Sequence, residues 1–269
     1  LRNLLNNRYY LSQYRGFKIY SCPMHSIGGE LIRNRIYEKE IGSLITFHTK
    51  NSYSFIDIGA NIGIHSLLAS SRKINEEQKI LSIEPYEPIY EVLKKNIDAN
   101  GFTNIIPINK GLGESESKKY FFSSSDKNQG RGSFTKIHNA EKTDRKLSIT
   151  TLDKILEEHF PNKSSNLLLK IDVEGYEYFV LKGGASLLKE YHNISIICEM
   201  WLYDVERVRI GKLIIDFLKK LGFNNHYVIN DLMYRKYGEK GFNMFSHKSN
   251  NFQYITELKD DLLRQMPRL

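Results

Sequence analysis

The stretch SFIDIGANIGIHSLLAS (54–70) contains the residues whose spacing is most suggestive of chemistry. Asp57 ends a short apolar run, and Gly59, Asn61 and Gly63 form a turn into an apolar helical pattern. A strand–turn–helix unit of this kind presents backbone N–H groups to a ligand. A pyrophosphate site has the spacing G-x-G-x-x-G, which this turn lacks, and the acid before the turn opposes a pyrophosphate. The pattern favours a cationic ligand, such as the ammonium and sulfonium groups of S-adenosylmethionine.

The next apolar run, KILSIE, also ends in an acid, Glu84. A carboxylate at the carboxyl end of the second strand of such a sheet can accept hydrogen bonds from both hydroxyls of a ribose. We therefore expect Glu84 to bind the ribose of the cofactor.

A third group of candidates lies in LLLKIDVEGYE. Because side chains alternate along a strand, Leu168, Lys170 and Asp172 share one face, and Asp172 falls at the carboxyl end. Ligands of open α/β sheets lie outside the carboxyl ends, near the switch in strand order. If the first and fourth strands are neighbours there, Asp57 and Asp172 lie together at the mouth of the ligand site, outside the carboxyl ends of the strands.

The elements that must position these residues alternate between strand and helix. Continuous apolar runs predict strands at 53–58, 79–84, 104–109, 166–172 and 194–200. Helical periodicity predicts helices at 64–71, 88–102, 150–160, 177–191 (interrupted at its glycine pair) and 205–223. This alternation predicts an α/β fold, with a mostly parallel sheet covered by helices on both faces. Two late runs, 226–230 and 251–258, predict an antiparallel edge hairpin.

Residues 1–50 are expected to form a small N-terminal α+β extension that packs on the main domain, residues 51–269. Within it, RGFKIYS (15–21) predicts a strand, and 28–48 predicts a helix with a possible break at Gly42. The alternation pauses between residues 111 and 148, which are polar and charged and contain several glycines. Long loops often cover sites, so we expect residues 123–145 to form a mobile lid.

Composition limits the remaining possibilities. The chain has 269 residues and a formal net charge of +8, which raises the odds of a phosphate-bearing or nucleic-acid partner; the alternative interpretation is solubility alone. Cys22 and Cys198 are the two cysteines; Cys198 lies in an apolar run, so we expect a buried thiol and a reducing compartment, the cytoplasm. No apolar run is long enough to span a membrane, and no His/Cys cluster has the spacing of a metal site.

Four segments in this order, FIDIGANIGIHS, SIEPYEPIYEVLKKNIDANGFTNI, TTLD and LLLKIDVEGYEYFVLKGG, resemble the FkbM family of S-adenosylmethionine-dependent methyltransferases. The resemblance covers about Phe55 to Met200. It implies a class I methyltransferase (Rossmann-like) fold and the O-methylation of a hydroxyl on a sugar or other metabolite.

The resemblance also implies roles for individual residues. Contacts with the methionine end of S-adenosylmethionine would come from Asp57, Gly59, Asn61 and Gly63. Glu84 would hold the ribose, and Asp172 and Glu174 would line the reaction centre. Methyltransferases often place a polar residue against the adenine after the third strand; Asn109, Lys110 and Leu112 are the candidates, and Asn109 is our choice.

A hydroxyl acceptor needs a base, because it is a poor nucleophile until its proton is removed. Asp172 and Glu174 are the candidate bases, and Lys170 would tune Asp172 or stabilise the developing alkoxide. The structural alternatives are an ion pair for Lys170–Asp172 and a helix start for Glu174.

Other residues near these segments have a structural and a functional interpretation. Asp153 is expected to cap a helix, and His65 to pack in the core. His138 would reach the substrate from the long loop, and Glu199 would lie at the rim of the pocket. Trp201 and Tyr203 would stack on a substrate ring or belong to the core.

Three functions remain open from the sequence. The first is O-methylation of a small-molecule or glycan hydroxyl, and the second is methylation of the ribose 2′-hydroxyl of RNA, which the basic charge and the Lys–Asp pairing favour. The third is a cofactor-binding module without catalysis. Amino-methylation of bases is disfavoured, because DVEG stands where N/D-P-P-Y/F is expected.

Overall fold

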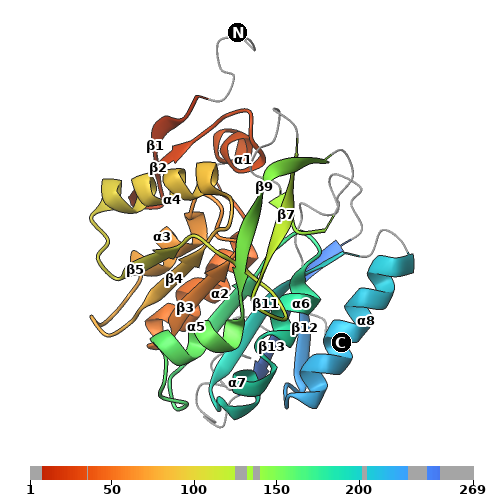
Figure 1. Ribbon diagram of the computed structural model, residues 1–269. Helices are drawn as coiled ribbons and strands as arrows, with labels where there is room; N and C mark the ends of the chain where they lie inside the picture. Colours follow the sequence, from red (N-terminus) through yellow and green to blue (C-terminus); the bar gives the residue numbers. More distant parts are fainter. Residues whose placement is uncertain are drawn as a thin grey trace.

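The computed structural model describes residues 8–34, 36–124, 132–135, 140–201, 205–229 and 241–248. Its centre is a seven-stranded sheet with the order β12-β13-β11-β10-β3-β4-β5 (Figure 1). The strands are β3 (Ser54–Ile58), β4 (Ile80–Ile83), β5 (Ile105–Ile108), β10 (Leu167–Ile171), β11 (Ile194–Trp201), β12 (Asn225–Ile229) and β13 (Gly241–Lys248). The five strands predicted from apolar runs are therefore all present.

The sheet is parallel from β5 through β11, and β13 is antiparallel to both β11 and β12. β3 and β10 are neighbours, as the sequence analysis required for a shared mouth. This arrangement confirms the predicted class I methyltransferase fold. The predicted edge hairpin is present, but its second strand is β13; the predicted run at 251–258 lies outside the described residues.

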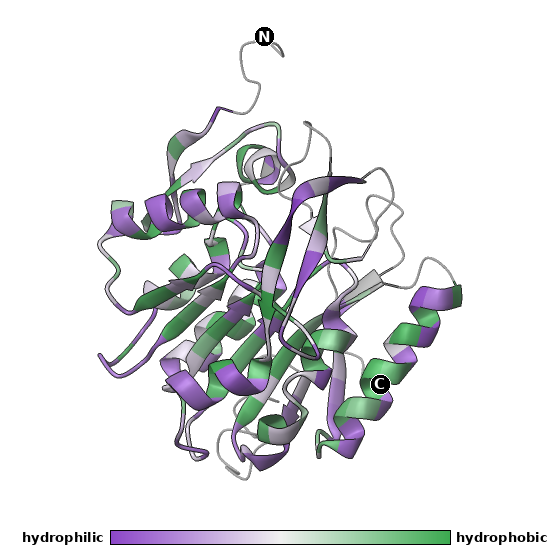
Figure 2. Cartoon of the chain, in the orientation of Figure 1, coloured by the Kyte–Doolittle hydropathy of each residue, from purple (hydrophilic) through white to green (hydrophobic). Residues whose placement is uncertain are grey.

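Helices cover both faces of the sheet (Figure 1). α2 (Lys39–Lys50), α3 (Ile64–Ser70) and α4 (Glu87–Asn100) contribute to a core cluster on one face. α5 (Leu152–His159), α6 (Glu177–Lys182), α7 (Ala185–Glu190) and α8 (Val205–Lys220) contribute to the cluster on the other face. Figure 2 shows the apolar strands between them, with hydrophilic residues on the outward helix faces.

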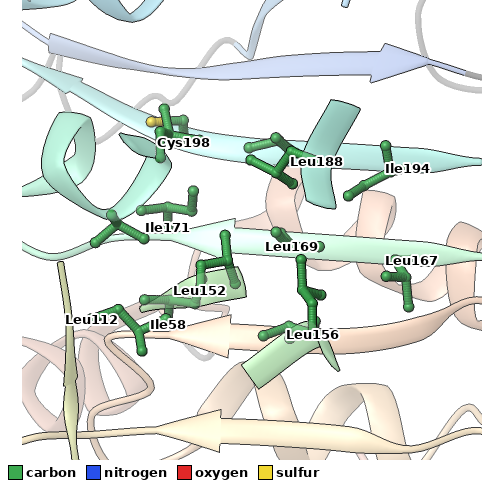
Figure 3. Packing of buried hydrophobic residues seen from close by; sticks show 14 of the residues in the cluster. Ile58, Leu112, Leu152, Leu156, Leu167, Leu169, Ile171, Leu188, Ile194 and Cys198 are labelled. Atoms are coloured by element: carbon green, nitrogen blue, oxygen red, sulfur yellow. The ribbon is translucent and has the colours of Figure 1, made fainter. Parts of the chain in front are cut away.

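The second cluster shows how consecutive strand residues are shared between the two faces. Every residue of β10 is buried, as a sheet covered on both sides requires. Leu167, Leu169 and Ile171 point into the cluster drawn in Figure 3, whereas Leu168 belongs to the first cluster. Cys198 is fully buried in the second cluster, which confirms its predicted core position.

The N-terminal residues form a hairpin, β1 (Tyr10–Tyr14) and β2 (Phe17–Ser21), followed by α1 (Ser26–Asn34) and α2. The hairpin docks on α4, where the Asn100 side chain pairs with both the N–H and the C=O of Lys18, each at 2.7 Å. The helix break expected at Gly42 is wrong: the helices divide before Lys39, and Gly42 lies inside α2. A Cβ there would meet Leu68 of α3 at 3.3 Å, so this glycine lets α2 and α3 approach closely. The division of the chain at residue 50 stays a prediction.

The stretch expected to be a long loop forms a second, four-stranded sheet instead. Its strands, in the order β6-β9-β7-β8, are β6 (Gly111–Leu112), β7 (Ser117–Ser124), β8 (Gly132–Ser133) and β9 (Ala140–Thr150). Charged residues of β7 and β9 face solvent, whereas Phe121 and Ile149 are buried. An alternating, half-solvated hairpin of this kind is as polar as a loop, which is why composition alone was misleading. Of the expected lid, residues 125–131 and 136–139 lie outside the described residues.

Asp153 is a helix cap, as expected, but for the neighbouring helix. The N-cap of α5 is Thr151, whereas the Asp153 carboxylate accepts hydrogen bonds from the N–H of Leu187 (2.8 Å) and Ser186 (3.4 Å) at the start of α7.

We predict that Asp153→Ala lowers the free energy of unfolding by about 1 kcal/mol, because the first N–H groups of α7 lose their acceptor. Cofactor affinity is expected to stay unchanged. Urea unfolding followed by circular dichroism measures the loss, with Glu157→Ala on an exposed position of α5 as the control. Equal stability of the two variants would show that the cap is energetically unimportant.

Candidate active site

The glycine turn after β3 is held by the two neighbouring strands. Gly59, Asn61 and Gly63 all have positive φ, at 82°, 53° and 88°. The N–H of Gly59 donates to the C=O of Ile83, and a Cβ at position 59 would come within 1.9 Å of the backbone oxygen of Asp172. Only glycine fits this close approach, so the turn and the end of β10 form one continuous surface.

Asp57 lies buried beneath this turn. Its Oδ2 accepts a hydrogen bond from Ser66 Oγ (2.7 Å), which in turn accepts one from Ser82 Oγ (2.7 Å). Burial raises the pKa of Asp57, although Lys170 and the Ser66 hydroxyl act in the opposite direction. Its Oδ1 has no hydrogen-bond partner within the described part of the chain. An unsatisfied buried carboxylate oxygen fits a site for a cation, either directly or through water.

Glu84 joins the end of β4 to the turn. Its two oxygens accept hydrogen bonds from the N–H of Tyr86 (2.9 Å) and the N–H of Asn61 (3.0 Å). Each carboxylate oxygen keeps a second lone pair, so the group can still accept two ribose hydroxyls. Burial raises the pKa of Glu84 to about 7; the two N–H donors lower it, and Asp57 and Asp172 raise it further.

The candidates for an adenine contact lie beyond β5 in different environments. Asn109 is exposed, and its amide nitrogen donates to the C=O of Glu84 (2.9 Å) and of Pro85 (3.2 Å). Lys110 is exposed as well, whereas Leu112 is buried in the second core cluster. Asn109 therefore joins the loop after β5 to the loop after β4. Its contact with adenine stays a prediction.

Lys170 is the buried cation at the mouth. Its ammonium donates to Asp172 Oδ2 at 2.7 Å, with side-chain exposures of 4% for Lys170 and 24% for Asp172. Asp57 stands opposite Lys170 in the register of β3 and β10. Burial alone would lower the pKa of Lys170, but Asp172, Glu38 and Asp57 outweigh burial and raise it. These carboxylates favour the charged ammonium, and the ion pair proposed as the structural alternative is present.

Glu38 and His65 complete the buried group, and the sequence analysis missed Glu38. Glu38 precedes α2 with φ 42°, and its Oε2 lies 3.3 Å from Nε2 of His65. Burial lowers the pKa of His65 well below its usual value, and Lys170 and Arg15 lower it further. The low pKa favours the neutral imidazole, and the buried position of His65 in α3 confirms its expected packing role.

Glu174, two residues after Asp172, has a left-handed backbone conformation with φ 55°. The next residue, Gly175, is also left-handed, with φ 94°. Glu177, which the sequence analysis also missed, is buried at the start of α6, and its Oε1 accepts the N–H of Val173 (3.2 Å) and of Gly175 (2.9 Å). Burial raises its pKa to about 7. An acid in the first helical turn after DVEG was the available signal.

The remaining candidates divide between described and undescribed residues. Glu199 is buried on β11, opposite Asn243 of β13. His138, Tyr203 and the side chain of Trp201 lie outside the described residues. In the ranges given above, no group of three or more His, Cys, Asp or Glu side chains is arranged to hold a metal ion. The helices in those same ranges are too short or too polar to cross a membrane.

The sequence profile described as "Methyltransferase FkbM domain" matches residues 57–224, which span the turn, Glu84, Lys170 and Asp172. The chain belongs to this family. The matched segment is more than half of the chain, and its members are S-adenosylmethionine-dependent methyltransferases, so this is a methyltransferase domain with S-adenosylmethionine as its cofactor. The acidic turn and the buried carboxylates are chemically compatible with that cation.

Individual proteins are also similar to this FkbM domain. The methyltransferase sdnD of Sordaria araneosa is 28% identical over 192 residues, which are 60% of this chain and 71% of the relative. A methyltransferase FkbM from Methylobacillus flagellatus has a TM-score of 0.48 and 16% identity over 73% of this chain, but over only 44% of its own length. An S-adenosylmethionine-dependent O-methyltransferase from Thermotoga maritima has a TM-score of 0.44 and 12% identity, covering 91% of this chain and 56% of that one.

We predict that Glu84 makes the cofactor-free FkbM domain less stable as the pH rises. A carboxyl group with a raised pKa binds more protons in the folded than in the unfolded state. Its stabilising contribution is therefore complete below about pH 4.5 and is lost as the pH rises through about 7.

Urea unfolding at pH 5 and pH 8 tests this prediction. Between the two pH values, the free energy of unfolding of Glu84→Gln is expected to fall by about 1–3 kcal/mol less than that of the wild type. Asp57 and Glu177, whose pKa values are raised too, leave a residual dependence in both proteins. Glu91→Gln on α4 is the exposed control, and an equal pH dependence in Glu84→Gln and the wild type would refute the prediction.

Proposed function

We propose that this FkbM domain transfers the methyl group of S-adenosylmethionine to a hydroxyl oxygen of a sugar or another small metabolite. The observation that carries the proposal is the position of Asp172. Its carboxylate is partly exposed, it is paired with Lys170, and its backbone lies against the turn at Gly59. A carboxylate beside the cofactor turn suits an acceptor that must lose a proton.

In this proposal the turn after β3 and Glu84 bind the cofactor, and the residues after β10 act on the acceptor. Bound S-adenosylmethionine supplies a methyl group on a positively charged sulfur, which keeps the bonding electron pair when the acceptor oxygen takes the methyl. The turn 59–63 and Glu84 would hold the methionine and ribose ends of the cofactor. Asp172 or Glu174 accepts the hydroxyl proton, and Lys170 keeps Asp172 in place and stabilises charge on the acceptor oxygen.

A screen of methyl transfer from methyl-labelled S-adenosylmethionine to sugars, glycosides and small hydroxylated metabolites tests the proposal. The proposal expects label in an ether that survives treatment with base, because an ether is not hydrolysed as an ester is. Label found on nitrogen or carbon would contradict it.

A second candidate acceptor is the ribose 2′-hydroxyl of RNA, which the outer face of the small sheet favours. There Lys142 Nζ lies 3.5 Å and Lys146 Nζ 5.2 Å from the centre of the exposed Tyr120 ring. Basic groups interleaved with an aromatic ring are typical of single-stranded nucleic-acid surfaces. Filter binding of labelled RNA across a salt series distinguishes this candidate, since phosphate contacts give an affinity that falls steeply with salt.

We predict that Glu84→Ala weakens S-adenosylmethionine binding at least about tenfold, because charged hydrogen bonds to the ribose are each worth about 1.5–3 kcal/mol. Calorimetry measures the dissociation constant, and circular dichroism checks that the fold is retained. Asn109→Ala, measured in parallel, tests the adenine contact. A wild-type dissociation constant in a folded Glu84→Ala protein would exclude the ribose role.

We predict that Asp172→Asn or Glu174→Gln lowers turnover by roughly 10²–10⁴, the usual contribution of a general base, with a much smaller change in cofactor affinity. Asp172 is favoured because it lies at the strand end beside Lys170. Steady-state rates on the acceptor found in the screen give the answer. If both folded variants turn over normally, the base lies elsewhere, and Glu199 is the next residue to test.

A further inference from the structure

The loop that carries both candidate bases depends on side chains from outside the loop. Residues 172–175 connect β10 to α6, and two consecutive positions, Glu174 and Gly175, are left-handed. Glu174 is not a glycine, so this conformation is unfavourable unless the surroundings impose it. The loop would relax into other conformations without those contacts, and both carboxylates would move with it.

Glu177 holds the loop from the helix side. A single oxygen, Oε1, accepts hydrogen bonds from the N–H of Val173 and the N–H of Gly175, the residues on either side of Glu174. The side chain is 2% exposed, so water does not compete for these donors. The distance between the two N–H groups, and hence the bend of the loop at Glu174, is set by this carboxylate.

The small sheet holds the same loop through a carbonyl group of its backbone. Ser133 Oγ at the end of β8 donates to the C=O of Val173 at 3.1 Å, and it also accepts the N–H of Thr135 at 3.1 Å. Thr135 Oγ1 lies 3.5 Å from the C=O of Glu174, a longer and weaker contact. Ser133 is 1% exposed, which makes its hydrogen bond to Val173 a buried one.

Two further contacts fasten the small sheet to the residue that follows the loop. Lys119 Nζ of β7 donates to Tyr176 Oη at 2.6 Å, and the rings of Phe134 and Tyr176 pack with their centres 5.6 Å apart. The small sheet and α6 thus both hold the loop 172–175 through hydrogen bonds to its backbone. The N–H of Val173 is bonded to Glu177, and its C=O is bonded to Ser133.

We propose that Ser133 and Glu177 are positioning residues that hold Asp172 and Glu174 at the reaction centre, which makes the small sheet part of the catalytic apparatus. The inference rests on the proposed function, since it assigns the two carboxylates to the reaction. Neither residue touches the acceptor in this proposal; both act through the backbone of the loop. An acceptor that contacts the small sheet would therefore also adjust the two carboxylates.

The variants follow from the geometry of the contacts. Glu177→Gln keeps a carbonyl oxygen that can accept both N–H groups, whereas Glu177→Met removes the acceptor at similar size. Ser133→Ala removes the donor to Val173. Ser148→Ala, on an exposed position of β9 in the same sheet, is the matched control.

Two readouts separate positioning from a merely structural effect. The first is turnover on the acceptor found by the screen, and it needs a methyl acceptor. The second needs none: it is the ratio of the dissociation constants for S-adenosylhomocysteine and S-adenosylmethionine, which differ in the charge on sulfur. Carboxylates held near the methyl favour the charged cofactor, so a displaced loop lowers this ratio.

We expect Ser133→Ala and Glu177→Met to lower turnover at least tenfold and the affinity ratio at least threefold. S-adenosylhomocysteine binding should stay within threefold of the wild type. Glu177→Gln should restore both readouts to within threefold of the wild type, and Ser148→Ala should match the wild type. If Glu177→Met does not fold, Ser133→Ala alone decides the question.

Unchanged turnover and an unchanged ratio in folded Ser133→Ala would overturn the inference, as would equal losses in Glu177→Gln and Glu177→Met. Asp172→Asn, measured alongside, keeps the two proposals apart. If Asp172→Asn lowers both readouts while the positioning variants do not, the inference fails and the proposed function stands. If Asp172→Asn and Glu174→Gln leave both readouts at the wild-type level, the two carboxylates are not at the reaction centre and the inference fails. The proposed function itself fails only if the screen finds the label on nitrogen or carbon.

Discussion

A single buried ammonium group, that of Lys170, organises the carboxyl end of the sheet. A charge taken out of water is unfavourable unless it is paired, and removing one partner of a buried pair typically costs about 3–5 kcal/mol. Lys170 is paired with Asp172 at 2.7 Å and lies in the field of Asp57 and Glu38. These three carboxylates follow β10, lie in β3 and precede α2, so one cation joins segments that are distant in the sequence.

The turn after β3 is fixed by residues that adjoin Lys170. Asp57 is fixed through Ser66 and Ser82, which sets the base of the turn. Gly59 brings that turn against the backbone of Asp172, and Glu84 fastens it to β4 through Asn61. Asp57, Glu84 and Asp172 place three carboxyl groups at this edge, which is chemically compatible with a cofactor carrying an ammonium and a sulfonium. The stability of this edge of the sheet thus depends on these charges.

The sequence predicted the central α/β unit well, because each of its strands is a continuous apolar run and each helix ends at a recognisable residue. Gly101, for example, ends α4 in a left-handed conformation, which glycine adopts readily. Asp57, Glu84 and Asp172 were identifiable for the same reason, since Asp57 lies near the end of an apolar strand and the other two directly follow one. The structure brings them to one edge, as parallel strands require.

Contacts between distant segments were not accessible in this way. Glu38, Ser133 and Glu177 do not directly follow an apolar run in the sequence. Tertiary packing buries Ser133 and Glu177, and it brings Glu38 to 3.3 Å from His65. The small sheet was interpreted as a loop, because its solvent face is charged and its apolar residues are few. β13 was missed altogether, although its residues pair with β11 along eight positions.

The most direct test of this account is a crystal structure of the protein with S-adenosylhomocysteine. The account predicts both ribose hydroxyls about 2.6–3.2 Å from the carboxylate of Glu84, and the sulfur on the side of the turn 59–63 that faces Asp172. An adenosine bound away from the carboxyl ends of β3 and β4, with Glu84 contacting only Asn61 and Tyr86, would contradict it.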